Sequence, residues 1–176
     1  MEREIENQHT PSPELGDLVR VINDEIRVFH ELLDTLEQEQ KAIVADDLAG
    51  IDSAAVAKTE QATRAKVLES ERVMLICELS ESLEMDAKGA DLQKLICAMD
   101  GPHSKELTRM REVLLDLNQR IRKTNENNSF LIRQSLRYTE RCLDILTGDP
   151  GARGLYGKFG HHARRRHGRS ILNRTA

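Results

Sequence analysis

The chain has 176 residues, of which 39% are hydrophobic, 32% are charged and only 3% are aromatic, with no tryptophan. Sandwiches and barrels of β-strands rely on aromatic and β-branched residues, so this composition disfavours them and favours long helices. The net charge is −4 at pH 7, but residues 147–176 carry seven basic residues and one acid, so an acidic body precedes a basic tail. We predict an all-α fold with a flexible N-terminus (1–11), one helical bundle domain (12–147) and a flexible tail (148–176) rich in Gly, Arg and His.

The first helix is predicted from Pro13 to about Asp46. Ser12 can cap its first amides, Pro13 suits the first helical position, and Glu14 suits the positive end of the helix dipole. Gly50 is expected in the connection that follows. The helix carries a seam of nine positions spaced alternately by four and three residues, which is typical of coiled-coil packing. These positions are Leu15, Val19, Ile22, Ile26, Phe29, Leu33, Leu36, Gln40 and Ile43, with Gln40 as the one polar member.

A second helix is predicted from about Asp52 to Lys88, with Gly89 beyond its end. Its seam has a small-residue half, followed by a bulkier half. Small residues let two helices approach closely, so we expect the bundle to be narrower at that end. The small half comprises Ala55, Ala62, Ala65 and Leu68, and the bulky half Ile76, Leu79 and Leu83. The segment from Asp91 to Met99 is predicted as a short linking helix before a break at residues 100–102.

The last helix is predicted from Ser104 to Leu146, where Gly148 and Pro150 form a stop signal. Its seam comprises Leu107, Met110, Leu114, Leu117, Ile121, Thr124, Asn128, Leu131, Ser135, Tyr138, Cys142 and Ile145. Several of these are polar, which in a coiled coil sets the register at a cost in stability. The three long helices predict an elongated antiparallel three-helix bundle, in which the longest helix leaves Leu136, Leu143 and Leu146 available to another protein.

Motifs for catalysis or cofactor binding are missing from the sequence. It contains no glycine-rich nucleotide loop, no nucleophile elbow and no zinc-protease motif, and its three cysteines are widely spaced. His161, His162 and His167 lie among arginines that repel a metal cation. We therefore expect no catalytic, cofactor or metal site, no small-molecule substrate, and reduced thiols. With no secretory signal or membrane-spanning run, the chain is expected in the cytoplasm.

Two functions remain open from these residues, one for the tail and one for the seam of the first helix. Residues 148–160 combine many glycines with Leu155, Tyr156 and Phe159, and such a segment can be a linker or a recognition element. Basic residues from Arg153 to Arg174 beside these aromatics could bind single-stranded nucleic acid, although the acidic body would repel a polyanion. Alternatively, the first seam could pair between chains and make the protein a self-assembling homo-oligomer.

A series of residues along the chain resembles the FlgN-type flagellar export chaperones. The series includes Glu31, the region of Lys58 and Arg72, and the run Ile121-x3-Asn125-x2-Asn128-x2-Leu131-Ile132-x2-Ser135-Leu136-x-Tyr138. It continues with Leu143, Leu146 and Gly148, then Tyr156-x3-Gly160, and closes with residues 170–176. The stretch His161–Arg169 and Gln40 depart from the pattern. The resemblance extends over nearly the whole chain from about residue 14.

This resemblance implies a cytoplasmic chaperone of flagellar type III secretion rather than an enzyme. Proteins of this family bind the C-terminal segments of the hook-associated proteins FlgK and FlgL, prevent their premature assembly and deliver them to the export gate. The expected client-binding residues are Asn125, Asn128, Leu131, Ser135, Tyr138 and Leu146. Tyr156, with Gly160, matches the tail position associated with docking at the gate.

Overall fold

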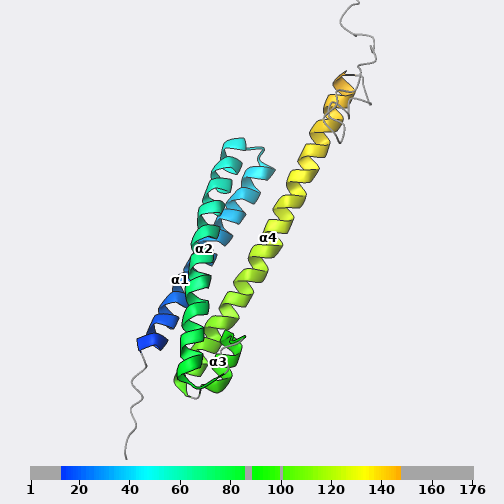
Figure 1. Ribbon diagram of the computed structural model, residues 1–176. Helices are drawn as coiled ribbons and strands as arrows, with labels where there is room; N and C mark the ends of the chain where they lie inside the picture. Colours follow the sequence, from blue (N-terminus) through cyan, green and yellow to red (C-terminus); the bar gives the residue numbers. More distant parts are fainter. Residues whose placement is uncertain (1–12, 86–88, 100, 148–176) are drawn as a thin grey trace, which may run out of the picture. The chain divides into compact units, whose positions relative to one another are not determined.

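The computed structural model describes residues 13–85, 89–99 and 101–147. These residues form α1 (Pro13–Val44), α2 (Leu48–Ser82), α3 (Leu92–Ala98) and α4 (Pro102–Thr147), with no strand among them (Figure 1). The all-α prediction is confirmed, and so is the short linking helix. The predicted N-terminal segment and tail lie outside the described residues. Two compact units meet at the Ser129–Phe130 bond inside α4, and the first contains α1, α2, α3 and α4 up to Ser129.

The start of α2 differs from the prediction because Asp47 caps it. The Asp47 carboxylate accepts a hydrogen bond of 3.1 Å from the Gly50 amide, so the helix begins at Leu48, four residues earlier than predicted. Gly50 was expected in the connection but lies in the first turn of α2. A Cβ atom at Gly50 would lie 2.5 Å from Asp47 Oδ2 and 2.9 Å from the Ala42 Cβ atom, so a larger residue would displace the capping carboxylate or α1.

The end of α2 also differs from the prediction. The helix ends at Ser82, where Leu83 is the C-cap, and Glu84 adopts a left-handed φ of 55°. A non-glycine residue in this conformation breaks the helical path, so α2 does not continue into residues 83–85. The rest of the predicted end, up to Lys88, lies outside the described residues. Further along, Gly101 has a φ of 93° and Pro102 begins α4, two residues before the predicted start.

Contacts within the first unit show in which direction each long helix runs relative to the others. Glu25 and Glu39 of α1 pair with Arg72 and Lys58 of α2, so the two helices run antiparallel as a hairpin. Leu107 of α4 belongs to the same buried cluster as residues near the start of α1, whereas Asn128 reaches α1 near its end. This part of α4 therefore runs parallel to α1 and antiparallel to α2, as an up-down-up bundle requires.

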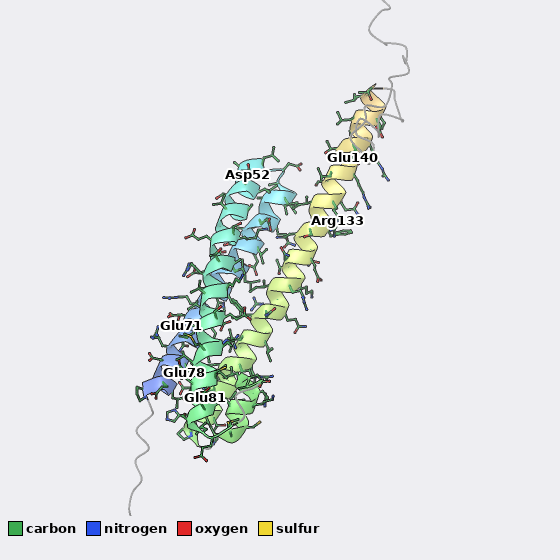
Figure 2. The ribbon with its side chains drawn as sticks, viewed as in Figure 1. Asp52, Glu71, Glu78, Glu81, Arg133 and Glu140 are labelled. Atoms are coloured by element: carbon green, nitrogen blue, oxygen red, sulfur yellow. The ribbon has the colours of Figure 1, made fainter. Side chains whose placement is uncertain are left out.

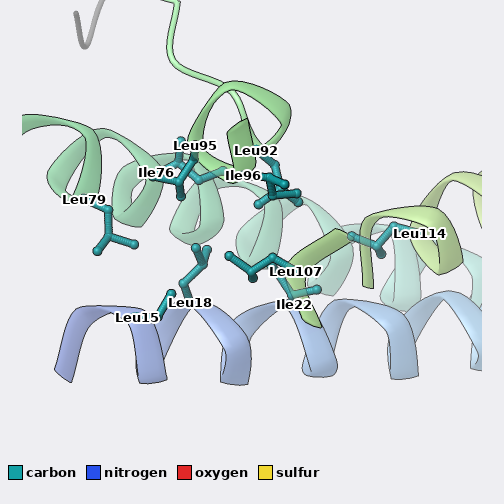
Figure 3. Close-up of a cluster of buried hydrophobic side chains, with 10 residues drawn as sticks. All are labelled: Leu15, Leu18, Ile22, Ile76, Leu79, Leu92, Leu95, Ile96, Leu107 and Leu114. Carbon is teal, nitrogen blue, oxygen red and sulfur yellow. The ribbon is translucent and has the colours of Figure 1, made fainter. Parts of the chain in front are cut away.

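The main hydrophobic core lies where all four helices meet (Figure 3). Leu18, Ile22, Leu95 and Leu107 are fully buried there. The short helix α3 contributes three side chains, so it is a structural part of the core as well as a connection. The cluster comprises Leu15, Leu18, Ile22, Ile76, Leu79, Leu92, Leu95, Ile96, Leu107 and Leu114.

Helix α1 buries a wider face than its predicted seam. Val19, Ile26 and Phe29 of that seam are half-buried, while Leu18 and Val28 beside it are fully buried. The reason is that α1 packs against α2 on one side and contacts α4 and α3 on the other. The seam of α1 is thus used within one chain, and the structure does not leave it free for pairing between chains.

Candidate functional site

The buried seam between α1 and α2 contains charged residues. The Arg72 Nε atom donates to the Glu25 carboxylate at 2.8 Å, and the Glu25 side chain is only 3% exposed. Burial raises the pKa of Glu25 above its ordinary value, because the loss of water outweighs the lowering effect of the Arg72 charge and hydrogen bond. The pair therefore links the two helices at a defined level, and removal of one partner leaves a buried charge uncompensated.

A second polar layer joins three helices around Glu39. Its carboxylate accepts hydrogen bonds from Lys58 of α2 and from the Asn128 side-chain amide of α4, the latter at 2.9 Å. The same amide donates to the Leu36 carbonyl at 2.8 Å, and the Asn128 residue is 1% exposed. Its Oδ1 atom is buried without a hydrogen-bond partner. Asn128 lies one residue before Ser129, the last residue of the first unit, so this polar layer lies at the boundary of that unit.

The structure places the predicted client-binding residues in different environments. Asn128 lies inside the first unit and uses its amide within the chain, so it holds α4 on α1 and is not open to a client. Asn125, on the same helix, is exposed. In the second unit Leu131 is half-buried, and Ser135, Tyr138 and Leu146 are exposed. Tyr156 and Gly160 lie outside the described residues.

The predicted seam of α4 behaves differently before and after residue 129. Up to Asn128 every seam position is buried or half-buried, as predicted. From Phe130 onward the helix carries large hydrophobic side chains that are mostly exposed, and Leu146 is 77% exposed. These residues are Phe130 (54%), Leu136 (59%), Tyr138 (71%), Leu143 (54%), Ile145 (79%) and Leu146 (77%), and we call them the α4 apolar surface.

A groove of about 700 Å³ also lies in the first unit. Phe29 and Leu32 of α1, Ala62 and Ala65 of α2 and Leu114 of α4 are among the residues that line it. The prediction that small residues of α2 allow close approach is wrong at Ala55 and Ala62, which are exposed. Ala54, one residue before Ala55 in α2, is buried instead.

The buried charges of the hairpin do not follow from the spacing of its hydrophobic residues. Glu25 and Glu39 lie on a second 3.5-residue stripe of α1 beside the predicted one, together with Leu18 and Leu32. A search for opposite charges on two neighbouring stripes could have found them. Lys58 and Arg72 entered the prediction only through the family resemblance, without a structural role.

Other classes of site receive no support from the described residues. Within residues 13–85, 89–99 and 101–147, no group of three or more His, Cys, Asp or Glu side chains could hold a metal ion. Over the same ranges, no helix is both long enough and apolar enough to cross a bilayer.

Within the described residues, the helical bundle thus continues into an α4 segment whose large hydrophobic side chains are exposed. Residues 14–164 match the FlgN protein family, so this chain belongs to the FlgN family of flagellar export chaperones. The match confirms the resemblance found in the sequence. No curated protein and no solved structure matches the chain.

Proposed function

We propose that this protein is a cytoplasmic export chaperone of flagellar type III secretion that binds amphipathic C-terminal segments of FlgK and FlgL. In this function it keeps the client unassembled and brings it to the export gate. Membership in the FlgN family supports the general role. The observation that carries the proposal is the α4 apolar surface, whose six large side chains are each at least 54% exposed.

Helix pairing explains how this surface takes a client. An amphipathic helix can lay its apolar stripe along another helix, with anchors at intervals of three and four residues. Leu131, Ser135 and Tyr138 follow such intervals, and Leu146 lies eight residues beyond Tyr138. These four residues are proposed as client contacts, together with Asn125 on an earlier turn of α4. Burial of even about 500 Å² of apolar area gains roughly 12 kcal/mol before ordering costs, which remove most of it. Moderate affinity suits a carrier that must release its cargo.

Asn128 takes a positioning role in this proposal. Its hydrogen bonds to Leu36 and Glu39 hold α4 against α1 at the last level of the first unit. Tyr156, with Gly160, remains the proposed contact to the export gate. Tyr156→Ala is therefore expected to leave client binding unchanged and to weaken docking at the gate.

Calorimetry with C-terminal segments of FlgK and FlgL tests the proposal. The full chain should bind at least one segment, and Leu143→Ser/Leu146→Ser should weaken binding by roughly tenfold or more. Val44→Ser/Leu48→Ser is the matched control, because those side chains are 73% and 76% exposed at the opposite end of the hairpin from the core. No detectable heat with either segment at high micromolar concentration, or equal losses in both double variants, would contradict the proposal.

A further inference from the structure

The end of α4 carries two apolar stripes that lie side by side. Both repeat at alternating intervals of four and three residues, and they are offset by one residue. The first stripe continues the predicted seam of α4, and we call it seam A: Leu131, Ser135, Tyr138, Cys142 and Ile145. The second stripe, seam B, comprises Ile132, Leu136, Thr139, Leu143 and Leu146. Together the two seams include all of the α4 apolar surface except Phe130.

The two seams together make a wide apolar face. At 3.6 residues per turn, successive residues are about 100° apart, so the seams cover about half of the circumference of the helix. The other half is mainly polar and carries Arg133 and Glu140, which are both exposed (Figure 2). A helix in a two-stranded coiled coil buries one narrow seam, whereas further apolar positions beside that seam are typical of a helix in a larger bundle. This face is therefore wide enough for two neighbouring helices.

The same helix has only one apolar seam in the first unit. The seam positions there are buried or half-buried, whereas the stripe one residue further along is mostly polar. The exposed members of that stripe are Leu115, Asn118, Arg122 and Asn125. Beyond Phe130, a partner that covered seam A alone would leave Leu136, Leu143 and Leu146 exposed to water. Complete burial of the apolar face at this end of α4 therefore requires a second helix.

We propose that the end of α4 binds two amphipathic helices of one client molecule side by side, one on each seam. This inference rests on the proposed function and deepens it, because it specifies that the client offers a pair of helices. Each client helix would carry its own apolar stripe at intervals of three and four residues. The two client helices and the end of α4 would then form a three-helix arrangement that covers both seams.

The seams differ in apolar content, which predicts which one a single helix prefers. Four of the five residues of seam B are leucine or isoleucine, whereas seam A has only Leu131 and Ile145 of this kind. Since the gain from burial grows with apolar area, an isolated C-terminal segment of FlgK should occupy seam B. The second helix of intact FlgK should occupy seam A. Because the two helices are linked in one molecule, intact FlgK should bind at least about tenfold more tightly than the segment.

Two matched double variants and two ligands test this arrangement. Leu136→Ser/Leu143→Ser changes seam B and Tyr138→Ser/Ile145→Ser changes seam A, each at two exposed positions seven residues apart. Fluorescence anisotropy measures binding of the dye-labelled segment and of dye-labelled intact FlgK to the full chain. The seam B variant should weaken both ligands by a similar factor of about tenfold. The seam A variant should weaken intact FlgK at least about tenfold more than it weakens the segment. Circular dichroism checks that both variants remain helical.

The pattern of losses separates this inference from the proposed function. If each double variant weakens the segment and intact FlgK by equal factors, one helix covers both seams, and the helix pair is overturned while the proposed function stands. Intact FlgK that binds wild type no more tightly than the segment would also overturn the pair. The converse pattern, with the seam B variant acting selectively on intact FlgK, retains the two helices and exchanges their seams. If the wild-type chain binds no segment of FlgK or FlgL, the proposed function fails and this inference fails with it.

A second copy of this chain is the other source of helices for the two seams. Sedimentation of the wild-type chain alone at several concentrations should show no association that the double variants remove. Association that both double variants abolish would assign the seams to copies of this chain and overturn the client pair.

Discussion

The α1–α2 hairpin and the end of α4 use the same 3.5-residue spacing for different purposes. In the hairpin, charged residues on a second stripe of α1, beside the predicted seam, find partners inside the chain, such as Glu25 with Arg72. In α4 beyond Phe130, seam positions such as Tyr138 and Ile145 remain exposed. Periodicity therefore predicts that a helix face will pack, but partner chemistry decides whether it packs within the chain or on another protein.

The largest difference between these regions should come from deleting leucine side chains. Leu107 is fully buried in the core, so Leu107→Ala should lower the free energy of unfolding by about 3 kcal/mol. Leu146→Ala, at a position 77% exposed, should change it by no more than about 0.5 kcal/mol. Urea unfolding followed by circular dichroism measures both. Equal losses would mean that the end of α4 is packed within the chain.

Breaking the buried ion pair should have the next largest effect. Arg72→Ala leaves the Glu25 carboxylate buried without its partner and should cost about 2 kcal/mol of stability. Replacing both residues by methionine removes the uncompensated charge, so Glu25→Met/Arg72→Met should be more stable than Arg72→Ala. The same urea titration applies. If the double variant is less stable than Arg72→Ala, the ion pair stabilises the fold by more than the neutralisation of a buried charge.

Removing the Asn128 amide tests the boundary between the two regions. Asn128→Ala loses hydrogen bonds to Leu36 and Glu39 and should cost about 1 kcal/mol. Asn125→Ala, on the same helix but exposed, should stay within about 0.5 kcal/mol of wild type. A positioning role also predicts weaker client binding by Asn128→Ala. Unchanged stability and unchanged binding together would show that this layer does not position α4.

The smallest expected effect is the pH dependence due to Glu25. Its pKa is higher in the folded protein than its ordinary value of 4.5, so the folded state binds more protons between those two values. The contribution of Glu25 to stability therefore rises as pH falls through the raised pKa and levels off below 4.5. The stability of wild type minus that of Glu25→Gln should increase from neutral to mildly acidic pH in urea titrations. If this difference in stability decreases as the pH falls, the pKa of Glu25 is lowered in the folded protein and the account is contradicted.

Much of the fold could be predicted because local signals agreed with it. Pro13 marks the start of α1 as predicted, and the leucines and isoleucines of α1 and α4 repeat at coiled-coil spacing. Pro102 was expected in the break before the last helix but is its first residue. The boundaries of α2 could not be predicted this way, because they depend on the Asp47 cap and on the left-handed Glu84 backbone. Small residues also proved ambiguous: Ala54 is buried, whereas Ala62 is exposed and lines a groove.

The candidate site was less predictable than the fold. The exposed apolar end of α4 followed from its length and pattern, and Leu136, Leu143 and Leu146 are exposed as expected. The role of Asn128 did not follow, because a polar seam residue reads the same in sequence whether it pairs inside the chain or contacts a client. Only the position of Glu39 opposite it separates the two cases.

Hydrogen exchange of the full chain, with and without a C-terminal segment of FlgK, tests the central claim most directly. If the exposed face of α4 receives the client, amides of residues 131–146 should exchange rapidly in the free protein and become strongly protected in the complex. Core amides around Leu18 and Leu107 should be protected in both states. Binding of the segment without added protection anywhere in residues 131–146 would contradict the account.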